Sequence, residues 1–246
     1  MYETLKKIIK NNVPNNFIQE NELFIRKIYA VFYSGTRKQC NICNKKLSCF
    51  VHNYRKELLC PNCGSLARDR RLWQIITNEY LKEKTTVLDF SPSRSLSRKW
   101  KKIPNINYNS TDFSGEFKAD FKYDITNLKI ESNTFDLICC YHILEHIEAD
   151  YKAMDELFRV LKPKGILIIQ TPFKEGDVYE NPLITSKKDR LTHFEQEDHV
   201  RIYSEIELKK RLQKAGFIVE IRHFNENIEN YFGFAQKETI FVISKP

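Results

Sequence analysis

A regular alternation of strand-like and helix-like segments, from residue 85 to the end of the chain, most constrains the fold. Buried strands are predicted at 85–90, 107–111, 134–140, 164–171, 217–222 and 239–244. Helices are predicted at 68–81, 148–161 and 206–215; in the second of these, Met154, Leu157, Phe158 and Leu161 share one face. This alternation favours a mostly parallel sheet covered by helices on both faces, a doubly wound α/β domain.

The segment between the fourth and fifth predicted strands is the candidate lid. Residues 173–203 show no sustained hydrophobic period, and they begin just after a strand ends. Ligands in doubly wound sheets bind at the carboxyl ends of the strands. We therefore expect this insert to lie over a ligand site.

Four cysteines follow the pattern Cys-x2-Cys-x16-Cys-x2-Cys, and they are Cys40, Cys43, Cys60 and Cys63. Two residues between thiolates let one tight turn direct both sulfurs at a tetrahedral ion, and this spacing is typical of structural zinc sites. The alternative is a set of unrelated reduced cysteines. Because four thiolates fill the coordination shell, we predict structural Zn²⁺ without a catalytic role.

Composition and order along the chain suggest the domain plan. The 246 residues favour one full domain with a small accessory unit, divided into a helical segment at 1–37, a zinc knuckle at 38–66 and a main domain at 67–246. No signal peptide or apolar span is evident, so we expect a cytoplasmic protein with no membrane partner. The N-terminal helices are candidates for a homodimer contact.

The order of motifs in the main domain resembles that of class I S-adenosylmethionine-dependent methyltransferases. The resemblance covers roughly residues 85–244, and its most specific parts are Leu144-Glu145-His146 and the segment 160–165. It implies a Rossmann-like methyltransferase fold with a seven-stranded sheet, and S-adenosyl-L-methionine as the methyl donor.

The same resemblance implies the donor-binding residues. Asp112, followed by Phe113, would accept hydrogen bonds from the ribose hydroxyls, while Asp124 would bind the adenine amino group and Ile125 would pack on the ring. The loop after the first strand would pass under the methionine end of the donor, and two residues would line the cavity near its sulfonium. These additional positions are Asp89, Ser91, Pro92, Ser93, Tyr141 and His142.

The first loop departs from the family pattern. It is normally glycine-rich so that the backbone can approach the donor, but the segment 91–95 contains no glycine. Either the loop approaches differently, with serine hydroxyls and Arg94 reaching the donor carboxylate, or the site no longer binds the donor.

Histidines are the candidates for a general base toward a hydroxyl acceptor, because imidazole titrates near neutrality. They are His142, His146 and His199, with His193 as a further candidate. The string His142-x-x-Glu145-His146 also matches inverted zinc peptidases. Its place after a buried strand favours a strand-to-loop turn over the single helix that a peptidase needs.

We predict a methyltransferase acting on a small molecule or a glycan. One alternative is an RNA methyltransferase, suggested by the net charge of +8 and by arginines next to the knuckle. The other is a noncatalytic, methyltransferase-like scaffold with a decayed donor loop.

Overall fold

A computed structural model describes residues 21–227 and 229–246, and it divides the chain into two compact units. The knuckle unit contains the described residues up to 81, with 93–103 and 224–238. The sheet unit contains 82–92, 104–223 and 239–246. The first unit is thus completed by two later segments, of which 224–238 lies far from it in sequence.

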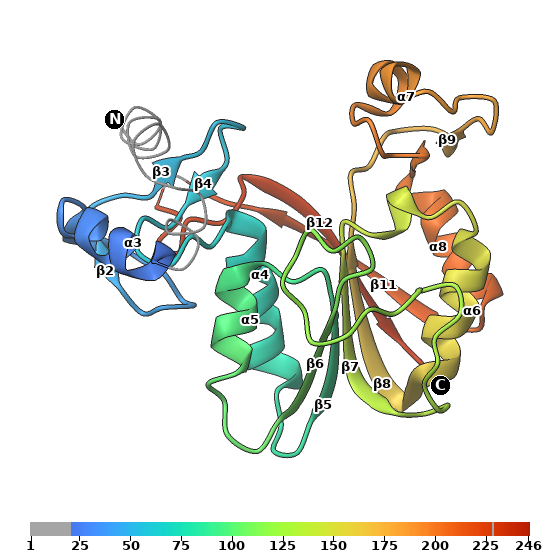
Figure 1. Ribbon diagram of the computed structural model, residues 1–246, viewed down its shortest axis with the longest axis horizontal. Coiled ribbons are helices and arrows are strands. Elements are labelled where there is room, and N and C mark those ends of the chain that lie inside the picture. The colour runs from blue at the N-terminus through green and yellow to red at the C-terminus, as the bar shows by residue number, and fades with distance from the viewer. Residues whose placement is uncertain (1–20, 228) are drawn as a thin grey trace. The chain divides into compact units, whose positions relative to one another are not determined.

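The central sheet has six strands in the order β11-β12-β8-β7-β5-β6 (Figure 1). Strands β5 to β8 are parallel to one another, whereas β12 runs antiparallel to β8. This arrangement confirms the predicted mostly parallel α/β fold. The strands are β5 (Thr86–Phe90), β6 (Asn107–Thr111), β7 (Phe135–Tyr141), β8 (Leu161–Gln170), β11 (Ile218–Asn225) and β12 (Lys237–Ser244).

The described sheet has one strand fewer than the seven expected from the resemblance. Beyond β6, pairing is reduced to an isolated parallel bridge between Thr111 and Phe121. The carboxylate of Asp112 accepts hydrogen bonds from the backbone N–H groups of Gly115 at 2.5 Å and Phe117 at 3.3 Å. These bonds shape the loop after β6. The chain then pairs with β6 only around Phe121, whose N–H donates to Ser110 O at 3.0 Å, and this contact is too short to form a seventh strand.

Two helices cover one face of the sheet. They are α6 (Asp150–Val160) and α8 (Glu205–Lys214), which lie side by side in Figure 1. Met154 and Leu157 of α6 and Leu208 and Leu212 of α8 are fully buried against sheet residues such as Ile138. The helical spacing that predicted α6 is therefore the spacing that fills the core.

The insert at 173–203 closes on itself at its base, where Phe173 pairs with Tyr203 in a parallel bridge. It contains a short antiparallel pair, β9 (Tyr179–Glu180) and β10 (Arg201–Ile202), and the helix α7 (Lys187–Phe194). Helix α7 was not predicted. The hydroxyl of Ser186 caps it by accepting from the N–H of Asp189, but the helix buries little besides Phe194 and has no apolar stripe.

The knuckle unit is built from short elements. They are α3 (Glu22–Val31), β1 (Ser34–Gln39), β2 (Lys46–Leu47), β3 (Val51–His52), β4 (Leu58–Leu59), α4 (Ala67–Ile75), the π-type turn η1 (Ile76–Tyr80) and α5 (Arg94–Trp100). Trp73 of α4 meets Trp100 of α5 edge-on, with centroids 5.1 Å apart. The buried Arg70 donates to the carbonyls of Phe232 and Ser65, which ties the segment 224–238 to the knuckle.

Some predictions for the chain ends stay predictions. Only residues 21–37 of the predicted helical segment are described, and α3 accounts for ten of them; residues 1–20 lie outside the described residues. The homodimer contact and the cytoplasmic location likewise remain expectations. In the described ranges, no helix combines the length and apolar character needed to cross a membrane.

Candidate functional site

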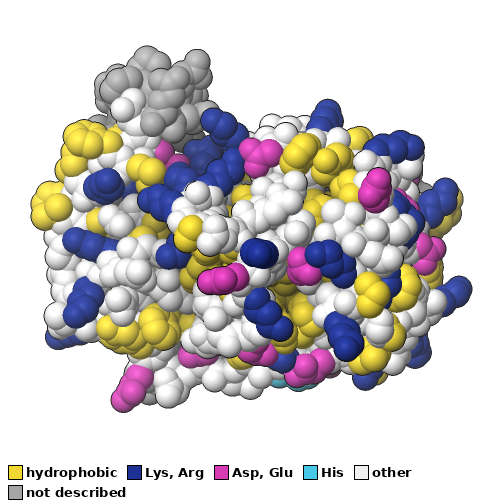
Figure 2. Space-filling view, turned by 90° about the horizontal axis from the view of Figure 1, so that it is seen from below, with side chains coloured by type: hydrophobic (Ala, Val, Ile, Leu, Met, Phe, Trp, Pro, Cys, Tyr) yellow, Lys and Arg dark blue, Asp and Glu magenta, His cyan; other side chains and the backbone are white. Residues whose placement is uncertain are grey.

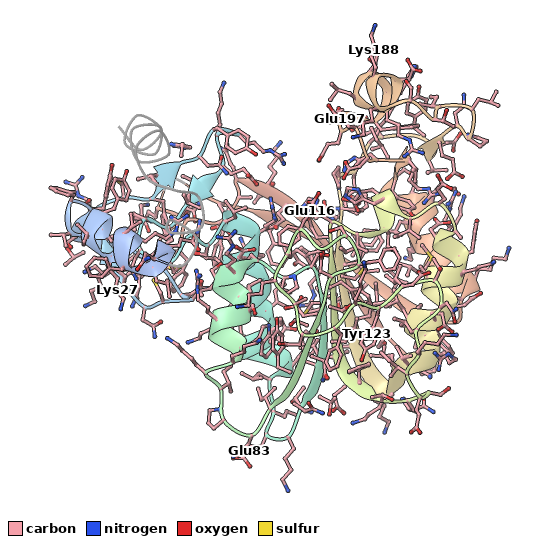
Figure 3. The ribbon with its side chains drawn as sticks, in the orientation of Figure 1. Lys27, Glu83, Glu116, Tyr123, Lys188 and Glu197 are labelled. Carbon is pink, nitrogen blue, oxygen red and sulfur yellow. The ribbon has the colours of Figure 1, made fainter. Side chains whose placement is uncertain are left out.

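A cavity of about 330 Å³ lies at the carboxyl end of the parallel strands in the sheet unit. Phe90 ends β5, Asp112 follows β6 and His142 follows β7, so three adjacent strands deliver side chains to one edge. Figure 3 labels Glu116 and Tyr123, which line the cavity from the loop after β6, and Glu83, at the opposite end of the sheet. The lining residues are Phe90, Ser91, Asp112, Phe113, Ser114, Glu116, Phe117, Tyr123, Asp124, Ile125, His142, Ile143, His146, Ile147 and Asp198.

Asp112 is the most heavily hydrogen-bonded carboxylate in the cavity. Ser91 Oγ donates to its Oδ1 at 2.7 Å, and Ser114 Oγ donates to Oδ2 at 3.0 Å, beside the two backbone N–H groups described above. Burial acts to raise the pKa of Asp112, but these hydrogen bonds, led by that of Ser91, outweigh it and lower the pKa. Asp112 is therefore ionised, and Oδ1 keeps a lone pair for a further donor.

Asp124 and Ile125 line the same cavity, as predicted for an adenine site. The exposed carboxylate of Asp124 accepts at Oδ1 from the backbone N–H and the hydroxyl of Thr126, at 2.8 and 2.7 Å. Ile125 is buried, whereas Phe113 is 60% exposed. A polar acceptor, an aliphatic side chain and an exposed aromatic ring thus stand along the loop from 112 to 125.

His142 takes an unusual backbone conformation directly after β7. Its φ is +54°, a left-handed value that non-glycine residues rarely adopt, and its N–H donates to Gln170 O at 2.8 Å. Its Nδ1 lies 3.2 Å from Oε1 of the buried Glu145. Burial acts to raise the pKa of Glu145, but the hydrogen bond and charge of His142 outweigh it and lower the pKa.

His146 and His199 form a ring pair beside the cavity. Their centroids are 4.6 Å apart at 84°, and His146 Nδ1 lies 3.1 Å from Asp198 Oδ2. His199 is only 2% exposed, and burial, followed by the charge of His146, lowers its pKa. Of the pair, only His146 is a lining residue, so the structure places the three predicted histidines together but leaves His199 behind the wall.

Several other predicted residues do not line the cavity. Asp89 is buried in β5, where it accepts from the Tyr108 hydroxyl at 3.1 Å. Ser93 is the N-cap of α5 and accepts from the N–H of Leu96. Arg94 pairs with Glu22 of the knuckle unit, which leaves it engaged away from a donor carboxylate. Pro92 and Tyr141 are likewise absent from the described wall.

The cavity wall is acidic. Among its described residues four are carboxylates, Asp112, Glu116, Asp124 and Asp198, and none is lysine or arginine. Such a wall favours a ligand with positive charge and disfavours one with phosphate groups.

The four predicted cysteines gather in the knuckle unit. Cys40 Sγ is 3.7 Å from Cys63 Sγ, and Cys43 Sγ is 3.8 Å from Cys60 Sγ. Zinc–sulfur bonds of 2.3 Å place the sulfurs of a tetrahedral site about 3.8 Å apart. Hydrogen bonding to Cys40 raises the pKa of Cys60 and Cys63, because several thiolates cannot share a buried space without a cation. The donor set therefore fits zinc.

Two matching turns aim these thiols. Asn44 N–H donates to Cys40 O at 2.7 Å, and Gly64 N–H donates to Cys60 O at 3.0 Å. Both Asn44 and Gly64 are left-handed, with φ of +58° and +81°. Asparagine and glycine are the residues that tolerate this conformation best, so both turns form at little cost.

Glu145 and Asp198 are the residues near the site that sequence reasoning left without a role. Glu145 was named only as part of the His-x-x-Glu-His motif. Its position three residues after His142 and next to His146 could have predicted a contact with these histidines. Asp198 precedes His199 in the insert, and no spacing connects it to His146; only the fold brings the two together.

Comparisons with known proteins show the family of this chain. A family model described as "Methyltransferase domain" matches residues 65–220. An uncharacterized protein of Methanocaldococcus jannaschii is 33% identical over 85 residues, 33% of this chain; the match spans only 37% of that relative's length.

Solved structures give the same fold at low identity. A SAM-dependent methyltransferase from Archaeoglobus fulgidus has a TM-score of 0.53 and 18% identity, covering 73% of this chain and 93% of that one. Phosphoethanolamine N-methyltransferase 2 of Haemonchus contortus, in complex with S-adenosylhomocysteine, has a TM-score of 0.51 and 14% identity, and the match covers 72% of this chain and 52% of that one. The [4+2]-cyclase SpnF has a TM-score of 0.51 and 17% identity, and the match covers 72% of this chain and 81% of that one. Because the family model spans more than half of the chain, this protein belongs to the methyltransferase-domain family.

Proposed function

We propose that the sheet unit transfers a methyl group from S-adenosyl-L-methionine to a small-molecule or glycan acceptor. The observation that carries this proposal is the ionised Asp112 at the carboxyl end of β6, facing a cavity with Asp124 and Ile125. A carboxylate oxygen with a lone pair still free can accept a hydrogen bond from a ribose hydroxyl, and the acidic wall attracts the positively charged methyl donor. Family membership alone would not suffice, since SpnF shares the fold and is a cyclase.

When bound, S-adenosylmethionine supplies a methyl group whose S–C bond breaks, with its electrons left on sulfur, as the acceptor's lone pair forms the new bond. The work of the chain is then alignment and exclusion of water. Asp112 and Asp124 fix the nucleoside end, while His142 and His146 stand at the β7 side of the cavity. The insert, through Asp198, closes the same side.

The acceptor is proposed to be a small molecule or a glycan on the basis of the charge of the cavity wall. An RNA acceptor would need cationic side chains near the reacting atom, whereas the described wall has four carboxylates. On the face in Figure 2, lysine and arginine side chains are scattered among acidic ones.

The test is calorimetric titration of the full chain with S-adenosylhomocysteine. Hydrogen bonds to a charged group contribute about 1.5–3 kcal/mol, so Asp112→Asn should weaken binding about 10- to 150-fold. Asp155→Asn, on the exposed face of α6, is the matched control and should bind like the wild type. Absence of saturable binding in the wild type would refute donor use and favour the noncatalytic scaffold.

We also propose that Cys40, Cys43, Cys60 and Cys63 bind one structural Zn²⁺. The support is their mutual spacing together with the paired turns. No open ligand position would remain, so the ion would stabilise the knuckle unit without joining the chemistry.

A further inference from the structure

A second cluster of metal-ligand residues lies in the sheet unit, beside the cavity. Glu145 and His146 belong to the short 3-10 turn η2 (Leu144–His146), and His199 comes from the end of the insert. One ligand-type atom from each lies within 4.8 Å of the other two. A tetrahedral ion with bonds of about 2.1 Å needs ligand separations of about 3.4 Å, so shifts of roughly one ångström would close the set.

The hydrogen bond of His199 fixes its free atom. Nδ1 lies 3.1 Å from the carbonyl oxygen of Phe194, and a carbonyl can only accept, so Nδ1 carries the proton. Nε2 then presents a lone pair. It is buried, and it has no hydrogen-bond partner among the described residues. A buried nitrogen left in this state is unfavourable unless a ligand completes it.

Glu145 also has a buried polar atom without a hydrogen-bond partner among the described residues, and this atom is a carboxylate oxygen. Its side chain is 1% exposed, and while Oε1 meets His142, Oε2 has no partner in the described chain. An ionised carboxylate oxygen and an imidazole lone pair cannot hydrogen-bond each other, because both only accept. One cation placed between them would satisfy both atoms.

His146 has a carboxylate beside one of its ring nitrogens. Its Nδ1 lies 3.1 Å from Asp198 Oδ2, an arrangement common for metal-binding histidines, in which the other nitrogen, Nε2, binds the ion. The backbone around the cluster is also fixed: Val200 N–H donates to Glu145 O at 2.9 Å, and Arg201 donates to the carbonyls of Leu144 and Glu148. The two chain segments that carry the three residues are therefore tied together before any ion binds.

We propose that Glu145, His146 and His199 bind one divalent first-row transition metal ion at the wall of the cavity, in a site separate from the four cysteines. Two imidazoles and one carboxylate suit ions such as Mn²⁺, Fe²⁺ and Zn²⁺. Three protein ligands leave at least one position for an oxygen ligand, and His146 belongs to both the cluster and the wall.

A consequence for the acceptor rests on the proposed function. The ion would lower the pKa of an acceptor hydroxyl bound at its open position, so that the oxygen could form the new bond to the methyl carbon, with its proton passing to water and the S–C electrons staying on the donor sulfur. The acceptor is then an alcohol, a phenol or a sugar hydroxyl. His146 and His199 act as metal ligands rather than as general bases.

The experiment is a Mn²⁺ titration of the zinc-replete full chain, with free Mn²⁺ followed by electron paramagnetic resonance. Thiolates prefer Zn²⁺, so Mn²⁺ reports on the oxygen and nitrogen site. We expect one Mn²⁺ to bind per chain. Glu145→Gln should weaken Mn²⁺ binding by at least about 100-fold, because replacing residues that only support metal ligands already lowers metal affinity by about 10- to 100-fold. Glu148→Gln and His193→Gln, exposed neighbours outside the cluster, should bind Mn²⁺ like the wild type.

A second variant guards against misfolding. His146 is 28% exposed at its side chain, so His146→Gln should keep the unfolding temperature of the metal-free protein while losing the rise that Mn²⁺ gives the wild type. The proposal is overturned if neither Mn²⁺ nor a second equivalent of Zn²⁺ binds, or if Glu145→Gln and His146→Gln bind Mn²⁺ unchanged. No donor or acceptor is present, so these outcomes are independent of the S-adenosylhomocysteine titration.

Discussion

The insert is anchored by a buried ion-pair network, and replacing Asp150 tests it. Asp150 Oδ2 accepts from the Tyr203 hydroxyl and from Arg211 Nη1, both at 2.6 Å, at the start of α6. Glu180 of β9 binds Arg201 and Arg211 at 2.7 and 2.6 Å. The network therefore joins both strands of the insert to α6 and α8.

The expected cost of Asp150→Ala follows from burial. The Asp150 and Arg211 side chains are 3% and 8% exposed, and removing one partner of a buried pair costs about 3–5 kcal/mol. Glu180 still neutralises part of the arginine charge, although its side chain is 35% exposed, so we expect the lower end, about 3 kcal/mol. For a chain of this size that is a fall of roughly 6–12 °C in the unfolding temperature.

Denaturant unfolding of the wild type, Asp150→Ala and Asp155→Ala measures this cost. Asp155 is exposed on the same helix, and its replacement should stay within about 0.5 kcal/mol. Hydrogen exchange should also speed up at residues 144–147, because Arg201 holds the Leu144 carbonyl. A loss below about 1 kcal/mol for Asp150→Ala, or equal losses for both variants, would refute the anchoring role.

Two further predictions concern the knuckle unit. Cys60→Ser should bind one Zn²⁺ fewer per chain, measured by metal analysis, than Cys49→Ser, which changes an exposed cysteine outside the cluster; equal zinc content in both would contradict the assignment. Burial raises the pKa of Glu238 to about 7 despite the nearby Arg71. The folded state then binds an extra proton above pH 4.5, so stability falls by about 3 kcal/mol as pH rises from 4.5 to 7. Glu238→Gln should flatten this slope in unfolding measured from pH 5 to 8, and an unchanged slope would argue against it.

The elements that could be predicted are those whose signal is local. Apolar runs located β5 and β7 within one residue, and helical periodicity located α6 within two residues, because the apolar positions that create these patterns are the ones that fill the core. The four cysteines were equally accessible, since ligand spacing within each pair is a property of one turn.

What could not be predicted depends on contacts between distant segments. Arg201 and Tyr203 are both buried against Asp150, more than fifty positions away along the chain. The grouping of 224–238 with the knuckle depends on carbonyls that accept from Arg70. Such partners leave no period or spacing in the sequence.

The loop after β5 contains no glycine, but its geometry still supports the carboxylate of Asp112. Ser91 has φ of +46°, so the loop makes its left-handed turn without glycine, at a cost of about 1–2 kcal/mol. In return, its hydroxyl donates to Asp112, a bond to a charged group that contributes about 1.5–3 kcal/mol. A glycine here would remove the strain and also the donor that helps to keep Asp112 ionised. The missing glycines are thus compatible with a built carboxylate site, and they are weaker evidence for a decayed donor site than the sequence alone implies.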